Sequence, residues 1–282
     1  MGDKPKRFDL RDEEVDAAMQ QCVARTHGLF LRHKDGREEI ASAVAVRIGS
    51  RFFLATAGHV TESETEIEVI RKPREQRVSD FVRRCGVNGD LDVGLLEVTH
   101  DQASTLGLFQ GGDEIFCHLD LHAGNHVIVA GFPAADCSSV VPGLMVSVPR
   151  STFAETVPLG DWPSNVVRAP DPDRDILISY PEEGRLQAIT PESPFSAQKA
   201  LLRPTAPPGG LSGGGVWLVA YRKIKPSGLL YPSSRLVGFQ VAWYEDLRVL
   251  LAVSARKWLE FVQEHYPDLQ DEIQCIIRRT TL

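Results

Sequence analysis

The chain has 282 residues, of which 43% are hydrophobic and 24% are charged, and its net charge is −7. This composition is typical of a globular protein with a substantial core, and the acidic balance argues against a nucleic-acid partner, which would need a basic surface. The sequence starts with no secretory signal and holds no apolar run long enough to cross a bilayer, so we expect no membrane partner.

The first part of the chain predicts one helix and then a series of short strands. Residues Asp12–Arg25 carry apolar side chains at helical spacing. Strand-like runs follow, separated by turn residues at 34–36 and 49–50. The runs are Leu29–Leu31, Ala43–Ile48, Arg51–Ala55, Glu66–Ile70 and Val93–Val98.

A second set of strands precedes two C-terminal helices. Ser254 is a candidate N-cap for a helix to about Glu264, and Asp268 for another helix after Pro267. Many short strands with almost no helix between them predict an all-β fold, an antiparallel sandwich or barrel. The strand-like runs are Val127–Ala130, Leu144–Val148, Asp175–Ile178, Val216–Ala220 and Leu236–Trp243.

The cysteines indicate a reducing compartment. Their number is odd and their spacing is unpaired, so we expect buried thiols and a cytoplasmic protein. None has the setting of a nucleophile or a zinc ligand. The five are Cys22, Cys85, Cys117, Cys137 and Cys275.

Three segments carry residues suited to acyl transfer. His59 follows an apolar strand, where a neutral imidazole can accept a hydroxyl proton and return it. Asp92 directly precedes a buried strand and can orient that imidazole, with Asp90 as the rival carboxylate. Ser212 lies among glycines, which leave room for a substrate carbonyl. Each residue alone is commonly structural, and their order within an all-β pattern is what suggests chemistry.

Together these segments resemble the three signatures of trypsin-like serine peptidases with the chymotrypsin fold, and the intracellular bacterial type among them. The signatures here are Thr56–Val60, Asp92–Leu96 and Gly210–Gly214. The resemblance extends over roughly residues 30–263. It implies two six-stranded antiparallel β-barrels with N-terminal and C-terminal helices.

The resemblance also implies a domain arrangement and a role for each residue. A helical extension would cover residues 1–27, a first barrel with His59 and Asp92 residues 28–125, a second barrel with Ser212 residues 126–253, and C-terminal helices residues 254–282. His59 would be the general base, Asp92 its orienting carboxylate and Ser212 the nucleophile. The N–H groups of Gly210 and Ser212 would form the oxyanion hole. No cofactor and no metal are expected.

The chain departs from the family pattern at several positions. Leu211 replaces an aspartate that pairs with a newly cut amino terminus in secreted members, so control would come from elsewhere, such as a regulatory protein partner. Ala206 falls at the floor of the specificity pocket, and Tyr244, after Ala242 and Trp243, replaces a usual glycine. These residues predict a protein or peptide substrate with a small or apolar residue before the cleaved bond.

Other interpretations are open at this point. The pattern around Ser212 also fits the nucleophile elbow of α/β-hydrolases, which requires a helix after the serine. His118, His122 and His126 recur at a spacing that would gather a metal on a helix, although Gly124–Asn125 disfavours one. The main functional alternative is a catalytically silent barrel that binds peptides or a protein partner.

Overall fold

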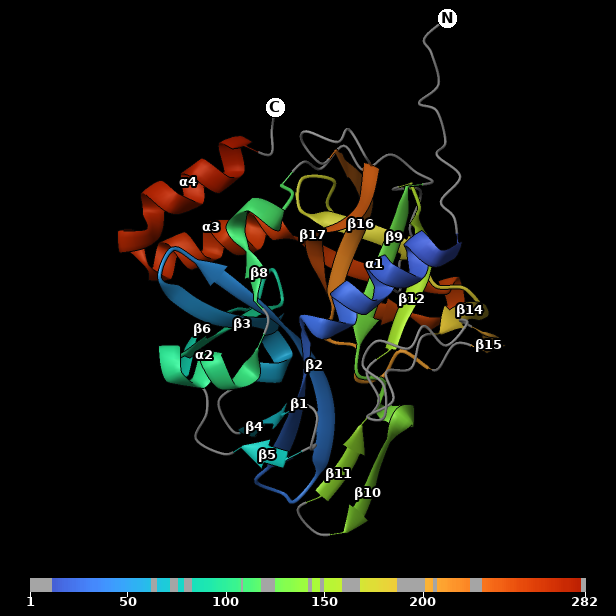
Figure 1. Cartoon of the computed structure of the whole chain (residues 1–282). Coiled ribbons are helices and arrows are strands. Elements are labelled where there is room, and N and C mark those ends of the chain that lie inside the picture. The colour runs from blue at the N-terminus through green and yellow to red at the C-terminus, as the bar shows by residue number, and fades with distance from the viewer. Residues whose placement is uncertain are drawn as a thin grey trace, which may run out of the picture.

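Strands dominate the computed structural model of the protein (Figure 1). The structure describes residues 12–61, 65–71, 76–78, 83–107, 109–117, 125–141, 144–147, 150–158, 168–186, 201–204, 207–223 and 230–279. It is mostly β, as predicted, with a helix near each end of the described chain.

The first half of the chain forms most of a ten-stranded sheet with the order β10-β11-β5-β4-β1-β2-β3-β7-β6, and β8 pairs with β2. The predicted turns are present, since Gly36 and Gly49 have φ angles of 83° and 57° between paired strands. The strands from this half are β1 (Thr26–His33), β2 (Glu38–Ile48), β3 (Arg51–Ala57), β4 (Thr65–Arg71), β5 (Gln76–Val78), β6 (Arg83–Asn88), β7 (Val93–Val98) and β8 (Gln110–Gly111).

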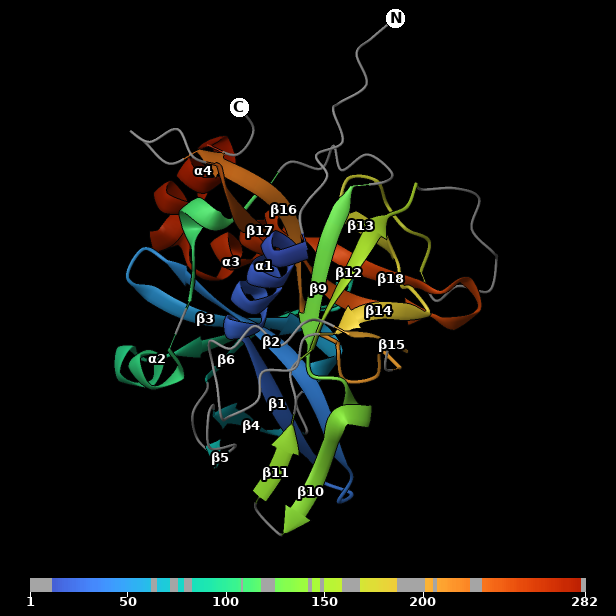
Figure 2. The same ribbon diagram turned by 45° about the vertical axis from the view of Figure 1, so that its right-hand side comes forward.

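The second half forms a closed six-stranded barrel in the order β12-β13-β18-β17-β16-β9, and several of its strands lie side by side in Figure 2. One of the two predicted barrels is therefore present, whereas a closed first barrel stays a prediction. A separate pair, β14 (Glu183–Leu186) and β15 (Leu201–Pro204), lies outside this barrel. The barrel strands are β9 (His126–Gly131), β12 (Arg150–Thr156), β13 (Asp175–Ser179), β16 (Gly215–Lys223), β17 (Leu230–Tyr244) and β18 (Val249–Ser254).

The hairpin of β10 (Cys137–Val141) and β11 (Leu144–Ser147) belongs to the first sheet. We expected Leu144–Val148 among the strands of the second half, and that assignment is wrong. Leu144 of β11 pairs with Gln76 of β5, so backbone hydrogen bonding extends the first sheet with strands from later in the chain. The domain boundary at residue 126 stays a prediction.

Helices close the structure at both ends. Helix α1 (Asp12–Ala24) buries Val15, Met19 and Cys22 against the barrel strands, and α4 (Gln270–Arg279) buries Ile273. Helix α2 (His100–Leu106) was not predicted. No helix within the described ranges is long and apolar enough to span a membrane.

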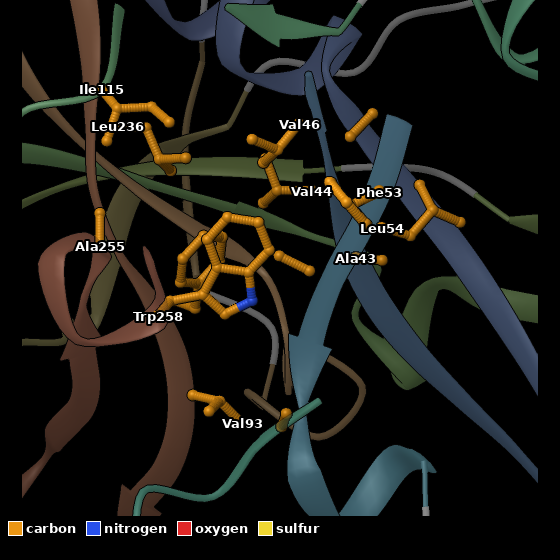
Figure 3. Packing of buried hydrophobic residues seen from close by; sticks show 14 of the residues in the cluster. Ala43, Val44, Val46, Phe53, Leu54, Val93, Ile115, Leu236, Ala255 and Trp258 are labelled. Atoms are coloured by element: carbon orange, nitrogen blue, oxygen red, sulfur yellow. The ribbon is translucent and has the colours of Figure 1, made fainter. Parts of the chain in front are cut away.

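Helix α3 (Ala255–His265) joins the two halves. Ser254 caps it by accepting a hydrogen bond from the Lys257 N–H at 3.3 Å, as predicted. Trp258 is fully buried, with its ring 6.5 Å from Phe53 of β3 and 5.2 Å from Phe239 of β17. Figure 3 shows this indole among apolar side chains from both halves. The barrel and the first sheet therefore share one hydrophobic core.

Candidate active site

His59 and Asp92 come from the same edge of two paired strands. Strands β3 and β7 are antiparallel, and Ala57 at the end of β3 pairs with Val93 at the start of β7. The residues that follow β3 and the residue that precedes β7 therefore leave the sheet at one place. Gly58 fits this position because a Cβ there would lie 3.0 Å from the Asp92 carboxylate oxygen.

The Asp92 carboxylate binds His59 through both its ring and its backbone. The His59 Nδ1 lies 2.9 Å from Oδ2 and 3.1 Å from Oδ1, and the His59 N–H donates to Oδ1 at 2.8 Å. Asp92 has a φ of 54°, a left-handed conformation that Asp and Asn adopt more readily than most residues. Since Nδ1 lies against a carboxylate and donates to it, the basic lone pair of the neutral ring lies on Nε2.

Solvent reaches this pair, since 47% of the His59 side chain and 31% of the Asp92 side chain are exposed. An ion pair with this exposure contributes little to stability. Asp90, the rival carboxylate, is exposed on the turn that precedes β7, and the structure gives it no contact with His59 among the described residues. The aspartate that the structure brings to His59 is Asp92.

Ser212 lies in a loop, residues 208–214, directly before β16. A strand follows this serine, which excludes the α/β-hydrolase interpretation. Gly213 has a φ of 84°, and a Cβ there would collide with the Ser42 carbonyl oxygen and the Thr56 hydroxyl. Only glycine fits so close to β2 and β3. Ser212 therefore lies beside the strand from whose end His59 extends.

Hydrogen bonds fix the peptide groups of this loop. The Gly209 carbonyl accepts from the Ala134 N–H at 2.7 Å, and the Leu211 carbonyl accepts from the Gly214 N–H at 2.6 Å. In a trans peptide the N–H points opposite to the C=O, so these bonds turn the N–H groups of Gly210 and Ser212 away from their carbonyl partners. None of the residues that the structure describes accepts a hydrogen bond from either N–H. Two oriented backbone donors are thus left for a ligand.

Leu211, between these two donors, is an apolar anchor. Its side chain is 3% exposed and packs with the barrel core residues Val129 and Val216. A Cβ on Gly131 would lie 2.7 Å from its Cδ2, so the close packing depends on that glycine. Burial of a leucine side chain stabilises the loop by about 2 kcal/mol without any ion pair.

The predicted substrate-binding residues Ala242, Trp243 and Tyr244 form the end of β17. Tyr180 packs edge-on against Trp243, with ring centroids 5.5 Å apart. The Tyr244 hydroxyl donates to the Arg168 carbonyl at 3.0 Å, and burial raises the pKa of Tyr244 above its ordinary value, so the hydroxyl stays a donor at neutral pH. Ala206 lies outside the described residues.

The remaining polar candidates are only partly described. His126 begins β9, with Nδ1 3.4 Å from Glu155 Oε1 and its ring stacked on Phe153, while His118 and His122 lie outside the described residues. No group of His, Cys, Asp and Glu within the described ranges could hold a metal ion.

The cysteine predictions are also only partly covered by the structure. Cys22 and Cys117 are buried thiols, as predicted, whereas Cys275 is exposed on α4, so the prediction of a buried thiol is wrong there. The side chains of Cys85 and Cys137 are not described.

One residue of this region was missed from the sequence. Ser42 on β2 is completely buried and contacts the Ser212 loop through its backbone and side chain. The sequence signal is a hydroxyl residue inside the apolar run from Ile40 to Val46, and such a residue is usually a minor core position. Its partner Gly210 lies 168 residues later in the chain, so the spacing of residues in the sequence could not reveal the contact.

The fold is similar to that of solved HtrA-type serine proteases. An HtrA-type protease, AlgW, solved with a tripeptide, superposes with a TM-score of 0.52 at 14% identity, over 90% of this chain and 63% of that chain. The serine endoprotease from Yersinia pestis superposes with a TM-score of 0.51 at 13% identity, over 96% of this chain and 68% of that one. No family model and no curated protein matches the chain. The chain spans less than two thirds of the length of the AlgW structure.

Proposed function

We propose that the protein is a serine endopeptidase that cleaves peptide bonds through His59, Asp92 and Ser212. The observation that carries this proposal is the bifurcated hydrogen bond from His59 Nδ1 to the two Asp92 carboxylate oxygens, at 2.9 and 3.1 Å. That contact directs the basic Nε2 outward, and the Ser212 loop packs on the strand that precedes His59. A chymotrypsin-like double barrel belongs to the same proposal.

In the proposed reaction, Ser212 Oγ attacks the substrate carbonyl carbon while His59 Nε2 takes the hydroxyl proton. The oxyanion that forms accepts hydrogen bonds from the N–H groups of Gly210 and Ser212, each worth on the order of 3 kcal/mol. The imidazolium then protonates the leaving amine, and the C–N bond breaks to give an acyl-enzyme. A water, deprotonated by His59, attacks the ester, and the Ser212 oxygen leaves with the returned proton.

The substrate side of the proposal is a protein or peptide that lies along the end of β17. AlgW was solved with a tripeptide, which supports a peptide ligand for this fold. Aromatic side chains at Trp243 and Tyr244 support a small or apolar residue before the cleaved bond. Leu211 anchors its loop by burial, which supports control by a protein partner instead of a cut amino terminus. The cytoplasmic location expected from the thiols is part of the same proposal.

Labelling with a fluorophosphonate tests the activity. Ser212 Oγ should displace fluoride and form a phosphonyl ester, whereas the Ser212→Ala protein should remain unlabelled at equal concentration. The matched control is Ser179→Ala, which removes an exposed serine from β13 and should label as the wild type does. If Ser212→Ala and the wild type are equally unreactive while a peptide still binds, the protein is a silent peptide-binding module.

A further inference from the structure

Ser42 uses every polar atom it has at the junction between β2 and the Ser212 loop. Its N–H donates to the Ser212 carbonyl at 2.8 Å, and its hydroxyl donates to the Gly210 carbonyl at 2.7 Å. The same hydroxyl accepts from the Phe132 N–H at 2.8 Å, and its own carbonyl accepts from the Thr56 hydroxyl at 2.7 Å. The side chain is fully buried, so water does not replace any of these contacts.

The contacts from Ser42 hold every second peptide group of the loop, and the peptide groups between them carry the two N–H donors of Gly210 and Ser212. Neighbouring bonds from Ala134 and Gly214 fix the Gly209 and Leu211 carbonyls, and Ser42 fixes the two carbonyls in register with them, Gly210 and Ser212. Gly210 has a φ of 88°, and a glycine without restraint can rotate its peptide groups at little cost. The Ser42 hydroxyl is the one described group that holds the Gly210 carbonyl.

We propose that Ser42 is a positioning residue for the oxyanion hole. Its hydroxyl keeps the Gly210 carbonyl turned toward β2, and its N–H keeps the Ser212 carbonyl there, so that the N–H groups of Gly210 and Ser212 stay aimed at the developing oxyanion. A hydroxyl suits this position because one atom both accepts from Phe132 and donates to Gly210. The inference rests on the proposed peptidase activity.

The test compares Ser42→Ala with Ser254→Ala. Both substitutions remove a buried serine hydroxyl that makes backbone hydrogen bonds, but Ser254 caps α3 and is not part of the site. We expect the rate constant for fluorophosphonate labelling of Ser212 to fall by about 10- to 100-fold in Ser42→Ala, because the phosphoryl oxygen uses the oxyanion hole. Ser254→Ala should label at the wild-type rate even if its stability falls by a similar amount.

A second readout separates positioning from general damage. A peptide aldehyde, whose hemiacetal oxygen needs the oxyanion hole, should bind Ser42→Ala about 10-fold or more weakly than the wild type. The same peptide as an amide, measured on Ser212→Ala with and without Ser42→Ala, should bind within about twofold. Equal labelling rates and equal aldehyde affinities in Ser42→Ala and Ser254→Ala would overturn the inference and leave the peptidase proposal intact.

Two further outcomes are decisive. A wild-type protein that never labels would overturn the peptidase proposal and this inference together. If Ser42→Ala does not fold, Ser42→Cys keeps a side chain of similar shape with a weaker donor. Its labelling rate must then lie below those of the wild type and Ser254→Ala, and a rate equal to theirs would overturn the inference.

Discussion

At the scale of single residues, Asp92 combines an unusual backbone with two hydrogen bonds to one histidine. Its φ of 54° turns the carboxylate back over Gly58, where it receives both the His59 N–H and the ring Nδ1–H. The backbone contact holds the histidine main chain, and the ring contact fixes the tautomer. A carboxylate accepts at both oxygens, whereas an asparagine that accepts the His59 N–H with its oxygen would present its NH2 group, a donor, to Nδ1.

We therefore expect Asp92→Asn to leave the fold unchanged and to slow Ser212 labelling by about 10³- to 10⁴-fold, because the ring would adopt the wrong tautomer. Asn tolerates the left-handed backbone as Asp does, so the melting temperature should stay close to that of the wild type. Asp90→Asn, two residues away on the same turn, is the matched control and should label normally. A large loss in Asp90→Asn with normal labelling of Asp92→Asn would reverse the assignment.

At the scale of elements, the end of β17 and the residues near it determine the size and charge of the proposed pocket for a substrate side chain. Asp175, the first residue of β13, has a fully buried side chain and already binds the Arg168 guanidinium at 3.0 and 2.9 Å and the Asp171 N–H at 2.8 Å. This carboxylate is therefore not available to a substrate cation. The Tyr244 ring, tied to Arg168 through its hydroxyl, occupies space where a glycine would leave a wider opening.

In a peptide library we expect cleavage mainly after small or apolar residues, at least about 10-fold above cleavage after Arg or Lys. The buried Asp175 carboxylate is already paired with Arg168, and the residue expected at the pocket floor is the uncharged Ala206, so neither would repay the desolvation of a cation. Tyr244→Gly should extend cleavage to larger side chains. Tyr244→Phe keeps the ring and removes one hydrogen bond, and its profile should match the wild type. Strong cleavage after Arg by the wild type would contradict this preference.

Elements were predictable from the sequence where local pattern and tertiary packing agree. Helices α1 and α3 carry apolar residues at helical spacing, and Ser254 is a strong N-cap, so both could be predicted. Helix α2 was missed although Thr99 and Gln102 form a capping box, because its short polar sequence has no apolar stripe. Strand β11 was assigned to the wrong half, since strand pairing with β5 depends on contacts far apart in the chain.

At the scale of the whole molecule, the residue types of the candidate site could be predicted from the sequence, but the contacts that hold those residues in place could not. His59, Asp92 and Ser212 stand next to strand ends, and His59 and Ser212 have small neighbours, which is a local pattern. The contacts of Ser42 with Gly210 and of Tyr244 with Arg168 join residues from distant segments, so the sequence around each residue does not reveal its partner. Cys22, by contrast, lies on the buried face of α1, and its burial agrees with the prediction from helical spacing and from the cysteine pattern.

Cys22 provides a test of global stability. Burial raises the pKa of its thiol from 9.0 to about 12. As the pH rises, the unfolded chain loses this proton first, so the stability is complete below about pH 9 and falls as the pH approaches 12. In denaturant titrations between pH 9 and 11, the wild type should lose up to about 1.4 kcal/mol per pH unit more than Cys22→Ala. Parallel pH profiles for the two proteins would show that the thiol is exposed to solvent.

The origin of the three proposed catalytic groups has a consequence for control. His59 and Asp92 both leave one sheet, whereas Ser212 leaves the barrel, and α3 bridges the two bodies through Trp258. A small displacement of the sheet relative to the barrel would separate the Ser212 hydroxyl from the His59 imidazole, while the backbone hydrogen bonds within the sheet and within the barrel stayed intact. A ligand that binds both the sheet and the barrel could therefore switch the activity on or off without unfolding any strand or helix.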